Sequence, residues 1–381
     1  MMKKLIIPLL FILLTSSVYA TSSLSYISPT PNDNASILDN DFVRINISVN
    51  ESNLQELKYN WDGTNFTIFN DSLVLMMNFD NVSDLGESNG AVIDISEYNH
   101  TITINNTSPT FTNSGKFNGA YQFNGGGMFY TPSYKPEIRT LMFWMKTYDQ
   151  YANLTTPYDD PQNRYLFSQR FDSTETIGEW DMGWFSQPKL RIYAYYNNGG
   201  SAKGHALVTN TDFSTNIWYH VAVTSDGSQV VYYVNGQLDS THVHNVVLGG
   251  SNNDDELFIG GGGANDNLFY FNGTLDEIRV WNRTLSADEV YQHYVSNLNK
   301  INSTQWSFYI NQSENATNGL AEGAYTYFAA ASNNTGAETI LATRTINIGS
   351  IQALVPEFSD YAIMLILITT IGGFFYIRKR D

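Results

Sequence analysis

The chain of 381 residues contains no cysteine. This absence excludes disulfide bonds, thiolate nucleophiles and cysteine-based metal sites. Charged residues are also scarce, at 15%, and 37 acidic residues outnumber 20 basic ones to give a net charge of −17. A chain with so few cations is poorly suited to bind nucleic acid or an anionic lipid surface, and it is better suited to bind cations such as Ca²⁺.

Aromatic residues, by contrast, make up 14% of the chain, with 25 Tyr and 22 Phe, and Asn, Ser, Thr and Gly are abundant. This composition is typical of an extracellular β-protein rather than a cytosolic helical enzyme. Many Asn-x-Ser/Thr sequons fit a glycosylated surface chain, among them those at Asn46, Asn65, Asn81, Asn105, Asn153, Asn272, Asn311 and Asn333. Without disulfides, such a protein must derive its stability from large sheets.

The N-terminal residues have the pattern of a secretory signal peptide. Lys3-Lys4 precede the apolar stretch Leu5 to Leu14, which is followed by the small-x-small sequence Val18-Tyr19-Ala20. We therefore expect a signal peptide over residues 1–20 and a mature chain that begins near Thr21. An uncleaved N-terminal anchor is the alternative.

The C-terminal residues have the pattern of a membrane anchor. An apolar run over residues 361–377 follows a linker at 350–360 and precedes the basic tail 378–381. As a helix it would be roughly 26 Å long, slightly short of a ~30 Å hydrocarbon core. Because Lys and Arg beside a span remain in the cytoplasm, we expect everything before Val355 to lie outside the cell.

The order Pro356-Glu357-Phe358, apolar helix and basic cluster resembles the archaeal PEF-CTERM sorting signal. The resemblance implies that Pro356, Glu357 and Phe358 are recognised by an archaeosortase-type enzyme, which cuts nearby and transfers the protein to a membrane lipid. A plain single-span anchor is the alternative. Both interpretations predict a protein on the extracellular face of the cell membrane.

The centre of the chain predicts a β-meander. Strands are expected at 218–224, 230–234 and 237–240, separated by Asp226-Gly227 and Asn235-Gly236. Such dipeptides indicate two-residue hairpin turns, because both central residues need a positive φ.

A short helix is predicted to start after Ser286. Ser286 and Glu289 form a capping box, and Leu285 and Val290 form a hydrophobic staple. The expected buried stripe comprises Val290, Tyr291, Tyr294, Val295 and Leu298.

Together with other segments, these residues resemble the laminin-G-like, concanavalin A-like jelly roll of secreted proteins. The matching segments are the strand 73–80, the loop 94–99, the strands 121–125 and 141–146, the meander after Trp218, and the closing strand with Asp276-Glu277. The resemblance covers residues 72–299.

The two flanks of this region complement each other. Val43, Ile45, Ile47 and Val49 alternate with polar residues, and residues 306–310, 325–329 and 342–348 also read as strands. Each flank is too small to bury a core by itself. We therefore expect one immunoglobulin-like sandwich from residues 22–70 and 302–349, with the jelly roll inserted at an exposed loop. The predicted fold class is all-β, a jelly-roll sandwich inserted into a small immunoglobulin-like sandwich, plus one C-terminal transmembrane helix.

Three carboxylates are candidate ligands for a structural Ca²⁺ ion. Asp80 ends the opening strand, Asp276 lies in the closing strand, and Asp94 begins a loop that resembles the metal loop of the family. Ca²⁺ takes six to eight oxygen ligands, which carboxylates, Asn and backbone carbonyls could supply. The loop departs from the family pattern at Ser96-Glu97-Tyr98. Ordinary solvated or capping carboxylates are the alternative.

Glycoside hydrolysis is disfavoured by the sequence. Glucanases of the laminarinase type, which share this fold, place Glu-x-Asp-x-Glu on one strand, and the nearest match here is Glu179-Trp180-Asp181-Met182-Gly183. Gly183 replaces the second glutamate, so one of the two catalytic carboxylates is missing. We therefore expect no enzyme activity.

Clusters of aromatic and amide residues are candidates for sugar binding by stacking. We select Trp184, Tyr193, Tyr195 and Asn197, with burial in the core as the alternative. The sequence thus predicts a non-catalytic archaeal cell-surface protein that presents a laminin-G-like domain for adhesion to a glycan, the envelope or another protein. A structural surface-layer component is the second hypothesis, and a glycoside hydrolase-like enzyme is the third.

Overall fold

The computed structural model describes residues 23–38, 42–105, 109–132, 134, 137–148, 164–169, 180–184, 188–198, 201–244, 248, 256–262 and 270–349, with the backbone only at 195–198 and 201–203. The predicted signal peptide, the residues Pro356, Glu357 and Phe358, the apolar run 361–377 and the basic tail lie outside these ranges. Within them, no helix combines the length and apolar character needed to span a bilayer.

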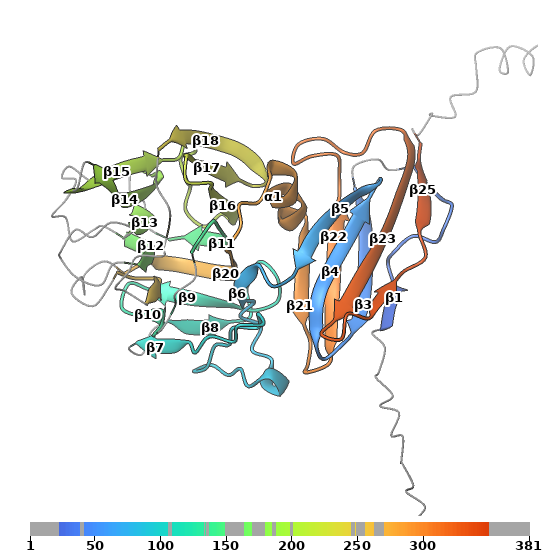
Figure 1. Cartoon of the computed structure of the whole chain (residues 1–381), viewed down its shortest axis with the longest axis horizontal. Coiled ribbons are helices and arrows are strands. Elements are labelled where there is room, and N and C mark those ends of the chain that lie inside the picture. Colours follow the sequence, from blue (N-terminus) through green and yellow to red (C-terminus); the bar gives the residue numbers. More distant parts are fainter. Residues whose placement is uncertain are drawn as a thin grey trace, which may run out of the picture.

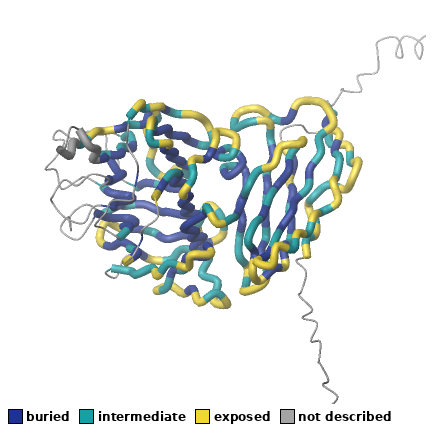
Figure 2. The backbone as a smooth tube through the Cα atoms, in the orientation of Figure 1, coloured by how far each residue is buried: buried dark blue, intermediate teal, exposed yellow. Residues whose placement is uncertain are grey.

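The described chain folds into two β-sandwiches that lie side by side (Figure 1). Each sandwich consists of two sheets, and buried residues line the space between them in both (Figure 2). The prediction of an all-β, sandwich-like fold is confirmed.

The smaller sandwich is built from both flanks of the chain. Its first sheet has the order β1 (Ser23–Ile27), β3 (Val43–Asn50), β22 (Gln305–Gln312), β21 (Ser296–Lys300). Its second sheet has the order β2 (Ala35–Ile37), β25 (Arg344–Ile348), β23 (Gly323–Asn333), β4 (Leu54–Trp61), β5 (Thr64–Phe69), with β24 (Glu338–Ile340) on β23. N-terminal and C-terminal strands therefore share both sheets.

Hydrophobic alternation explains this pairing. The apolar residues of β3 and those of β22 are buried on one face, and Ile47 of β3 lies opposite Phe308 of β22. Because side chains alternate across a strand, one register places both apolar rows in the same core.

The larger sandwich holds the residues between the flanks. One sheet has the order β18 (Gln237–Val243), β17 (Gln229–Val234), β16 (Tyr219–Ser225), β11 (Thr140–Thr147), β20 (Asn272–Trp281), β9 (Ala120–Asn124), β8 (Thr110–Thr112), with β6 (Leu73–Met77) on β20. The other has the order β15 (Ser201–Val208), β14 (Leu190–Asn198), β13 (Trp180–Trp184), β12 (Arg164–Gln169), β19 (Leu257–Ile259), β10 (Met128–Thr131), β7 (Thr103–Asn105). A 3-10 turn, η1 (Ser83–Leu85), follows β6.

The helix α1 (Ala287–Tyr294) connects the two sandwiches. Its capping box forms as expected, since Ser286 Oγ accepts from Glu289 N at 3.2 Å and Ser286 N donates to Glu289 Oε2 at 2.9 Å. The buried stripe differs from the expected one, because Gln292 and His293 are buried whereas Tyr291 and Tyr294 are only half-buried.

The chain enters the smaller sandwich earlier than expected. Residues 296–300 form β21, which pairs with β22, so Leu298 belongs to the core of the smaller sandwich and not to the helix. The expected boundary at residue 299 is corrected to one just before Ser296. The reason is register, since Leu298 lies opposite Phe308 in the sheet.

The two meander turns differ in geometry. Asn235 and Gly236 both have positive φ, 50° and 76°, as a two-residue hairpin of this kind requires. In the other turn Gly227 has φ 85°, while the Asp226 carboxylate accepts the amides of Ser228 and Gln229 at 2.7 and 2.8 Å. Asp226 therefore flanks this turn and stabilises it through its side chain.

Candidate binding site at the junction of the two sandwiches

The site begins with an irregularity in β20. The register against β11 shifts so that Trp144 lies opposite Asp276 and Met142 lies opposite Arg279, and Glu277 has φ 50°. Such a bulge redirects side chains at the edge of a regular ladder. Here it sends the carboxylate of Glu277 toward the smaller sandwich.

Arg279 and Glu277 join the two sandwiches through a buried polar network. The Nη2 atom of Arg279 donates to Glu277 Oε2 at 3.1 Å and to Asn297 Oδ1 at 2.6 Å, and Asn297 Nδ2 donates to Glu277 Oε1 at 2.8 Å. Asn78 adds a bond from its Nδ2 to Leu298 O at 2.8 Å. Glu277 and Arg279 are only 4% and 3% exposed, so each charge depends on its partners.

Burial shifts the pKa values of Glu277, Asp276 and His220. It raises the pKa of Glu277, although the positive charge of Arg279 opposes the shift. It also raises the pKa of Asp276, an effect that the neighbouring Glu277 strengthens. For His220, burial lowers the pKa to about 3, and the positive charges of Arg279 and Lys116 act in the same direction. Burial at the junction therefore disfavours the charged forms of Asp276 and Glu277 and keeps His220 neutral.

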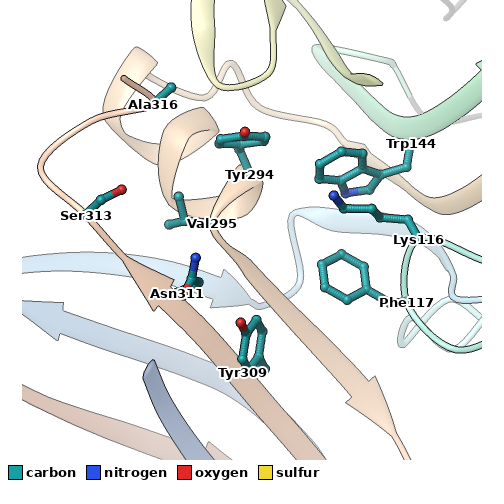
Figure 3. A pocket seen from close by; sticks show the side chains of 9 residues that line it. All are labelled: Lys116, Phe117, Trp144, Tyr294, Val295, Tyr309, Asn311, Ser313 and Ala316. Carbon is teal, nitrogen blue, oxygen red and sulfur yellow. The ribbon is translucent and has the colours of Figure 1, made fainter. Parts of the chain in front are cut away.

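A cavity of about 290 Å³ opens beside this network (Figure 3). The larger sandwich contributes Lys116 and Phe117 from a loop and Trp144 from β11. The end of α1 and the smaller sandwich contribute the remaining residues, Tyr294, Val295, Tyr309, Asn311, Ser313 and Ala316. We call this cavity the junction pocket.

Asp276 holds one wall of the junction pocket in place. Its Oδ2 atom accepts the amides of Lys116 and Phe117 at 2.8 and 3.0 Å, and its Oδ1 atom accepts the amide of Glu277 at 2.8 Å. A carboxylate that binds several amides fixes a loop conformation firmly. The buried network thus positions the loop that carries Lys116 and Phe117.

Four of the nine residues that line the pocket are aromatic, namely Phe117, Trp144, Tyr294 and Tyr309. The Lys116 ammonium lies 4.0 Å from the centre of the Trp144 ring, and Trp144 stacks on Tyr294 at 5.6 Å. On the same wall, the ring centres of Phe117 and Tyr309 lie 6.5 Å apart, and the two ring planes are tilted by 60°. Burial lowers the pKa of Lys116, while Asp276 opposes the shift. Such a wall offers ring faces, a cation and the amide of Asn311 to a ligand.

The predicted calcium ligands do not converge. Asp94 is buried and accepts the amides of Met76, Ser96 and His100 at 2.9 to 3.0 Å, together with a 2.8 Å contact to His100 Nδ1. Asp80 Oδ1 accepts the amide of Gly119 at 3.1 Å, and the charge of Asp80 adds to the rise in the pKa of Asp276 that burial causes. In the described part of the chain, no group of three or more His, Asp or Glu side chains could hold a metal.

This arrangement corrects the three-carboxylate site. The oxygen atoms of Asp94 and Asp276 already face amide donors of their own chain, which replace the cation that the sequence suggested. The described residues therefore do not fit a Ca²⁺ ion held by Asp80, Asp94 and Asp276 together.

The predicted sugar-binding aromatics have different fates. Trp184 is fully buried and stacks on Phe271 at 5.7 Å, so it belongs to the core and offers no exposed face. Tyr193 is half-buried on β14 beside Arg191, whose guanidinium lies 5.2 Å from its ring. The side chains of Tyr195 and Asn197 lie outside the described atoms. Trp184 was misjudged because core and surface aromatics look alike in a β-sequence.

The strand that resembled a glucanase motif is also part of the core. Asp181 is 2% exposed, and a Cβ atom at Gly183 would lie 2.0 Å from Arg164 O on the neighbouring strand β12. Gly183 is therefore required by the close approach of the two backbones.

The junction pocket itself was not predicted. Its residues come from segments near positions 116, 144, 294 and 310, which are far apart in the sequence. One signal was present, since Tyr309 occupies the face of β22 opposite to Phe308 and Ile310. An aromatic residue on that face indicated that something covers it.

Known structures resemble the chain only weakly. One is domain 4 of AbnA, a GH43 extracellular arabinanase from Geobacillus stearothermophilus, in complex with arabinotriose, with 18% identity, 57% of this chain and 96% of that chain covered, and a TM-score of 0.40. A second is the binding domain of botulinum neurotoxin serotype D, with 14% identity, 59% of this chain and 50% of that chain covered, and a TM-score of 0.42. A third is the Ruminococcus gnavus IT-sialidase CBM40 bound to alpha2,3 sialyllactose, with 15% identity, 45% of this chain and 94% of that chain covered, and a TM-score of 0.36. These scores are too low to carry an argument about function.

The sequence itself gives a clearer match. No curated protein matches the chain. Residues 139–291, which run from the start of β11 into α1, match the family model Laminin_G_3, described as the Concanavalin A-like lectin/glucanases superfamily. This match supports a laminin-G-like, concanavalin A-like domain in the larger sandwich.

Proposed function

We propose that this protein is a non-catalytic cell-surface binding protein and that its junction pocket takes a sugar residue of a glycan. The observation that carries the proposal is the pocket wall, in which the neighbouring rings of Phe117 and Tyr309 line a cavity of about 290 Å³. The match of residues 139–291 to a lectin and glucanase superfamily favours a carbohydrate as the ligand class.

The chemistry of the wall suits a sugar. A sugar ring has an apolar face that stacks on aromatic rings and hydroxyl groups that bind amides and hydroxyls. Asn311 and Ser313 supply such polar groups next to Tyr309. Because the cavity lies at the lower end of the usual ligand-pocket range of about 300–1,000 Å³, it suits one terminal residue rather than a long chain.

The pocket gives no support to hydrolysis. Glycosidases need two carboxyl groups that flank the scissile bond. The residues that line the described pocket include no carboxylate, and nearby Asp276 uses both oxygen atoms to bind amides. These features favour binding without cleavage.

The cell-surface location is proposed from the sequence. It depends on the signal peptide at 1–20 and on anchoring through residues 361–377 or, after archaeosortase-type processing near Pro356, Glu357 and Phe358, through a lipid. Intact-mass spectrometry of the protein from its native membrane tests this proposal. A chain that ends at Asp381 would contradict processing, and a chain that is released without anchor or lipid would contradict surface attachment.

A glycan array probed with the full mature ectodomain, produced without N-glycosylation, tests the binding function. Phe117→Ala and Tyr309→Ala should each weaken binding about tenfold, the effect of losing roughly 1.4 kcal/mol of stacking. Tyr98→Ala is the matched control, because Tyr98 is 46% exposed and lies outside the pocket. Binding should persist in the presence of a chelator.

Two results would contradict the proposal. The first is an array without any bound glycan, which would favour a structural surface-layer role. The second is glycan binding that survives both pocket substitutions, which would place the binding site elsewhere on the sandwiches.

A further inference from the structure

A glycosylation sequon lies inside the junction pocket. Residues 311–313 read Asn-Gln-Ser, which is an acceptor sequence for N-linked sugars. Asn311 occupies the second-to-last position of β22, and its side chain lines the cavity together with Ser313. The acceptor amide and the proposed sugar site therefore coincide.

The geometry directs the Asn311 amide into the cavity. Its backbone N–H donates to Val295 O at 2.8 Å, so the main chain is fixed. The Oδ1 atom is covered yet has no hydrogen-bond partner among the residues that the structure describes. Figure 3 shows the amide nitrogen of Asn311 directed toward the other side chains that line the cavity. A group attached to this nitrogen would extend into the pocket.

The Tyr309 ring lies where it can contact a sugar attached to Asn311. Residues two apart on a strand share one face, so Tyr309 and Asn311 both project from β22 toward the pocket. The first sugar on Asn311 would meet the Tyr309 ring, with Phe117 of the larger sandwich 6.5 Å beyond. An attached sugar would thus contact both sandwiches.

The sequons at Asn333 and Asn65 lack this arrangement. Asn333 is 6% exposed, its Nδ2 donates to Glu51 Oε2 at 3.3 Å, and its Oδ1 accepts Thr335 Oγ1 at 2.7 Å. A sugar there would break a buried network. Asn65 is exposed in β5, and its Oδ1 accepts Asn60 Nδ2 at 2.7 Å. Asn65 is a suitable reference sequon away from the pocket.

We propose that Asn311 carries an N-linked sugar whose first residue fills the junction pocket and excludes free glycan. The modification site stands on the geometry of Asn311, whereas the exclusion of free glycan rests on the function proposed above. In the modification, Asn311 Nδ2 bonds to C1 of a polyisoprenyl-phosphate-linked oligosaccharide. The C1–O bond to the phosphate breaks, the lipid phosphate leaves with the electron pair, and one amide proton is released.

The test compares full mature ectodomains secreted from an N-glycosylating host with the same chains made without glycosylation. Ser313→Thr keeps the sequon, and Ser313→Val, whose side chain has the shape of that threonine, removes it. Asn65→Gln removes the reference sequon. Because Ser313 Oγ contacts Tyr291 at 2.6 Å, each variant is measured against its own unglycosylated form. Glycopeptide mass spectrometry gives the occupancy of each site.

We expect Asn311 to be occupied in the wild-type, Ser313→Thr and Asn65→Gln chains. These chains should bind array glycans at least tenfold more weakly than their unglycosylated forms, while Ser313→Val should bind equally in both forms. The occupied chains should also melt at a higher temperature than their unglycosylated forms, and Tyr309→Ala should reduce that increase.

Either of two results would overturn the inference. An empty Asn311 in a chain whose Asn65 is occupied would exclude the modification, and an occupied Asn311 without a change in glycan binding or melting temperature would exclude pocket filling. If the unglycosylated chain binds no glycan, the proposed function fails by itself. The occupancy and melting measurements would then still decide whether the Asn311 sugar fills the pocket.

Discussion

Arg279 places one guanidinium where strand β20 of the larger sandwich meets strand β21 of the smaller one. Its Nη2 atom contacts Glu277, Asn297 and the carbonyl of Leu298. A buried ion pair contributes little net stability when complete, but removing one partner leaves an uncompensated charge. Residues at the junction should therefore respond to substitution in ways that depend on their partners.

Arg279→Met should destabilise the protein by about 3–5 kcal/mol at pH 8, because Glu277 would remain buried without its cation. Since burial raises the pKa of Glu277, its carboxyl can protonate at lower pH, and the loss should be smaller at pH 5. Denaturant unfolding at both pH values measures this effect. The double variant Glu277→Gln with Arg279→Met should recover at least about 1 kcal/mol, and the absence of recovery would show that Arg279 acts by packing.

His220 should make the protein less stable in acid. Its pKa falls from 6.5 to about 3 on folding, because it is buried beside Trp144 and Tyr294 and lies near the positive charges of Arg279 and Lys116. Between these values the unfolded chain binds a proton that the folded chain excludes, so stability falls as the pH falls. The slope for this histidine is about 1.4 kcal/mol per pH unit.

His220→Phe keeps the ring contacts and removes the titration. As the pH falls from 6 to 4.5, the unfolding free energy of the wild type should decrease more steeply than that of the variant. The difference between the two slopes should be about 1.4 kcal/mol per pH unit. His293, whose pKa burial also lowers, and the carboxyls of Asp276 and Glu277 titrate in both proteins, so they cancel in this comparison. Equal slopes would show that His220 titrates normally in the folded state.

At the scale of elements, the β17–β18 hairpin supports one side of the pocket. Gly236 in its turn has φ 76°, and a Cβ atom there would lie 2.6 Å from Tyr294 Cδ1. Tyr294 ends α1 and lines the junction pocket. A side chain added in the turn would therefore displace Tyr294 at the end of α1 and so alter the pocket.

Gly236→Ala should cost more than Gly63→Ala. Both glycines have positive φ, 76° and 83°, but an added Cβ at Gly63 meets nothing within 4 Å. Gly63→Ala should lower the free energy of unfolding by about 1–2 kcal/mol, the cost of a left-handed backbone for alanine. Gly236→Ala should lower it further, because the new Cβ atom must also displace Tyr294. Thermal unfolding of both variants measures the difference, and equal losses would mean that Tyr294 moves aside freely.

At the scale of the whole molecule, the smaller sandwich is split by the larger one. Strands β3 and β4 precede the inserted region, while β22 and β23 follow it and pair with them. The partners lie more than 200 residues apart, so their pairing closes a very long loop, which is a slow step in folding. The first and last segments of the inserted region lie close together at the junction (Figure 1), where Asn282 N donates to Ser72 O at 2.9 Å.

A chain in which residues 22–70 are joined directly to 296–349 should fold cooperatively, because it keeps every strand of the smaller sandwich. The matched chain that joins 22–70 to 302–349 lacks β21 and with it the buried Leu298, so it should be less stable. Circular dichroism during thermal unfolding compares the two. A broad transition in both would show that the smaller sandwich needs the larger one to fold.

The sequence by itself determined the elements and much of the fold class. The alternation of Val43, Ile45, Ile47 and Val49 specified a half-buried strand, Asn235-Gly236 specified a hairpin, and Ser286 with Glu289 specified the start of α1. These features are local, since a strand period, a turn or a cap depends on residues a few positions apart.

Only the tertiary structure decided which residues meet at the junction. The sequence could not show that Asp276 would bind the amides of Lys116 and Phe117 rather than a cation, that Trp184 would be buried, or that Tyr309 and Asn311 would line a pocket with Phe117. These contacts join segments separated by up to about two hundred positions. They depend on how two sandwiches pack together, which no local pattern specifies.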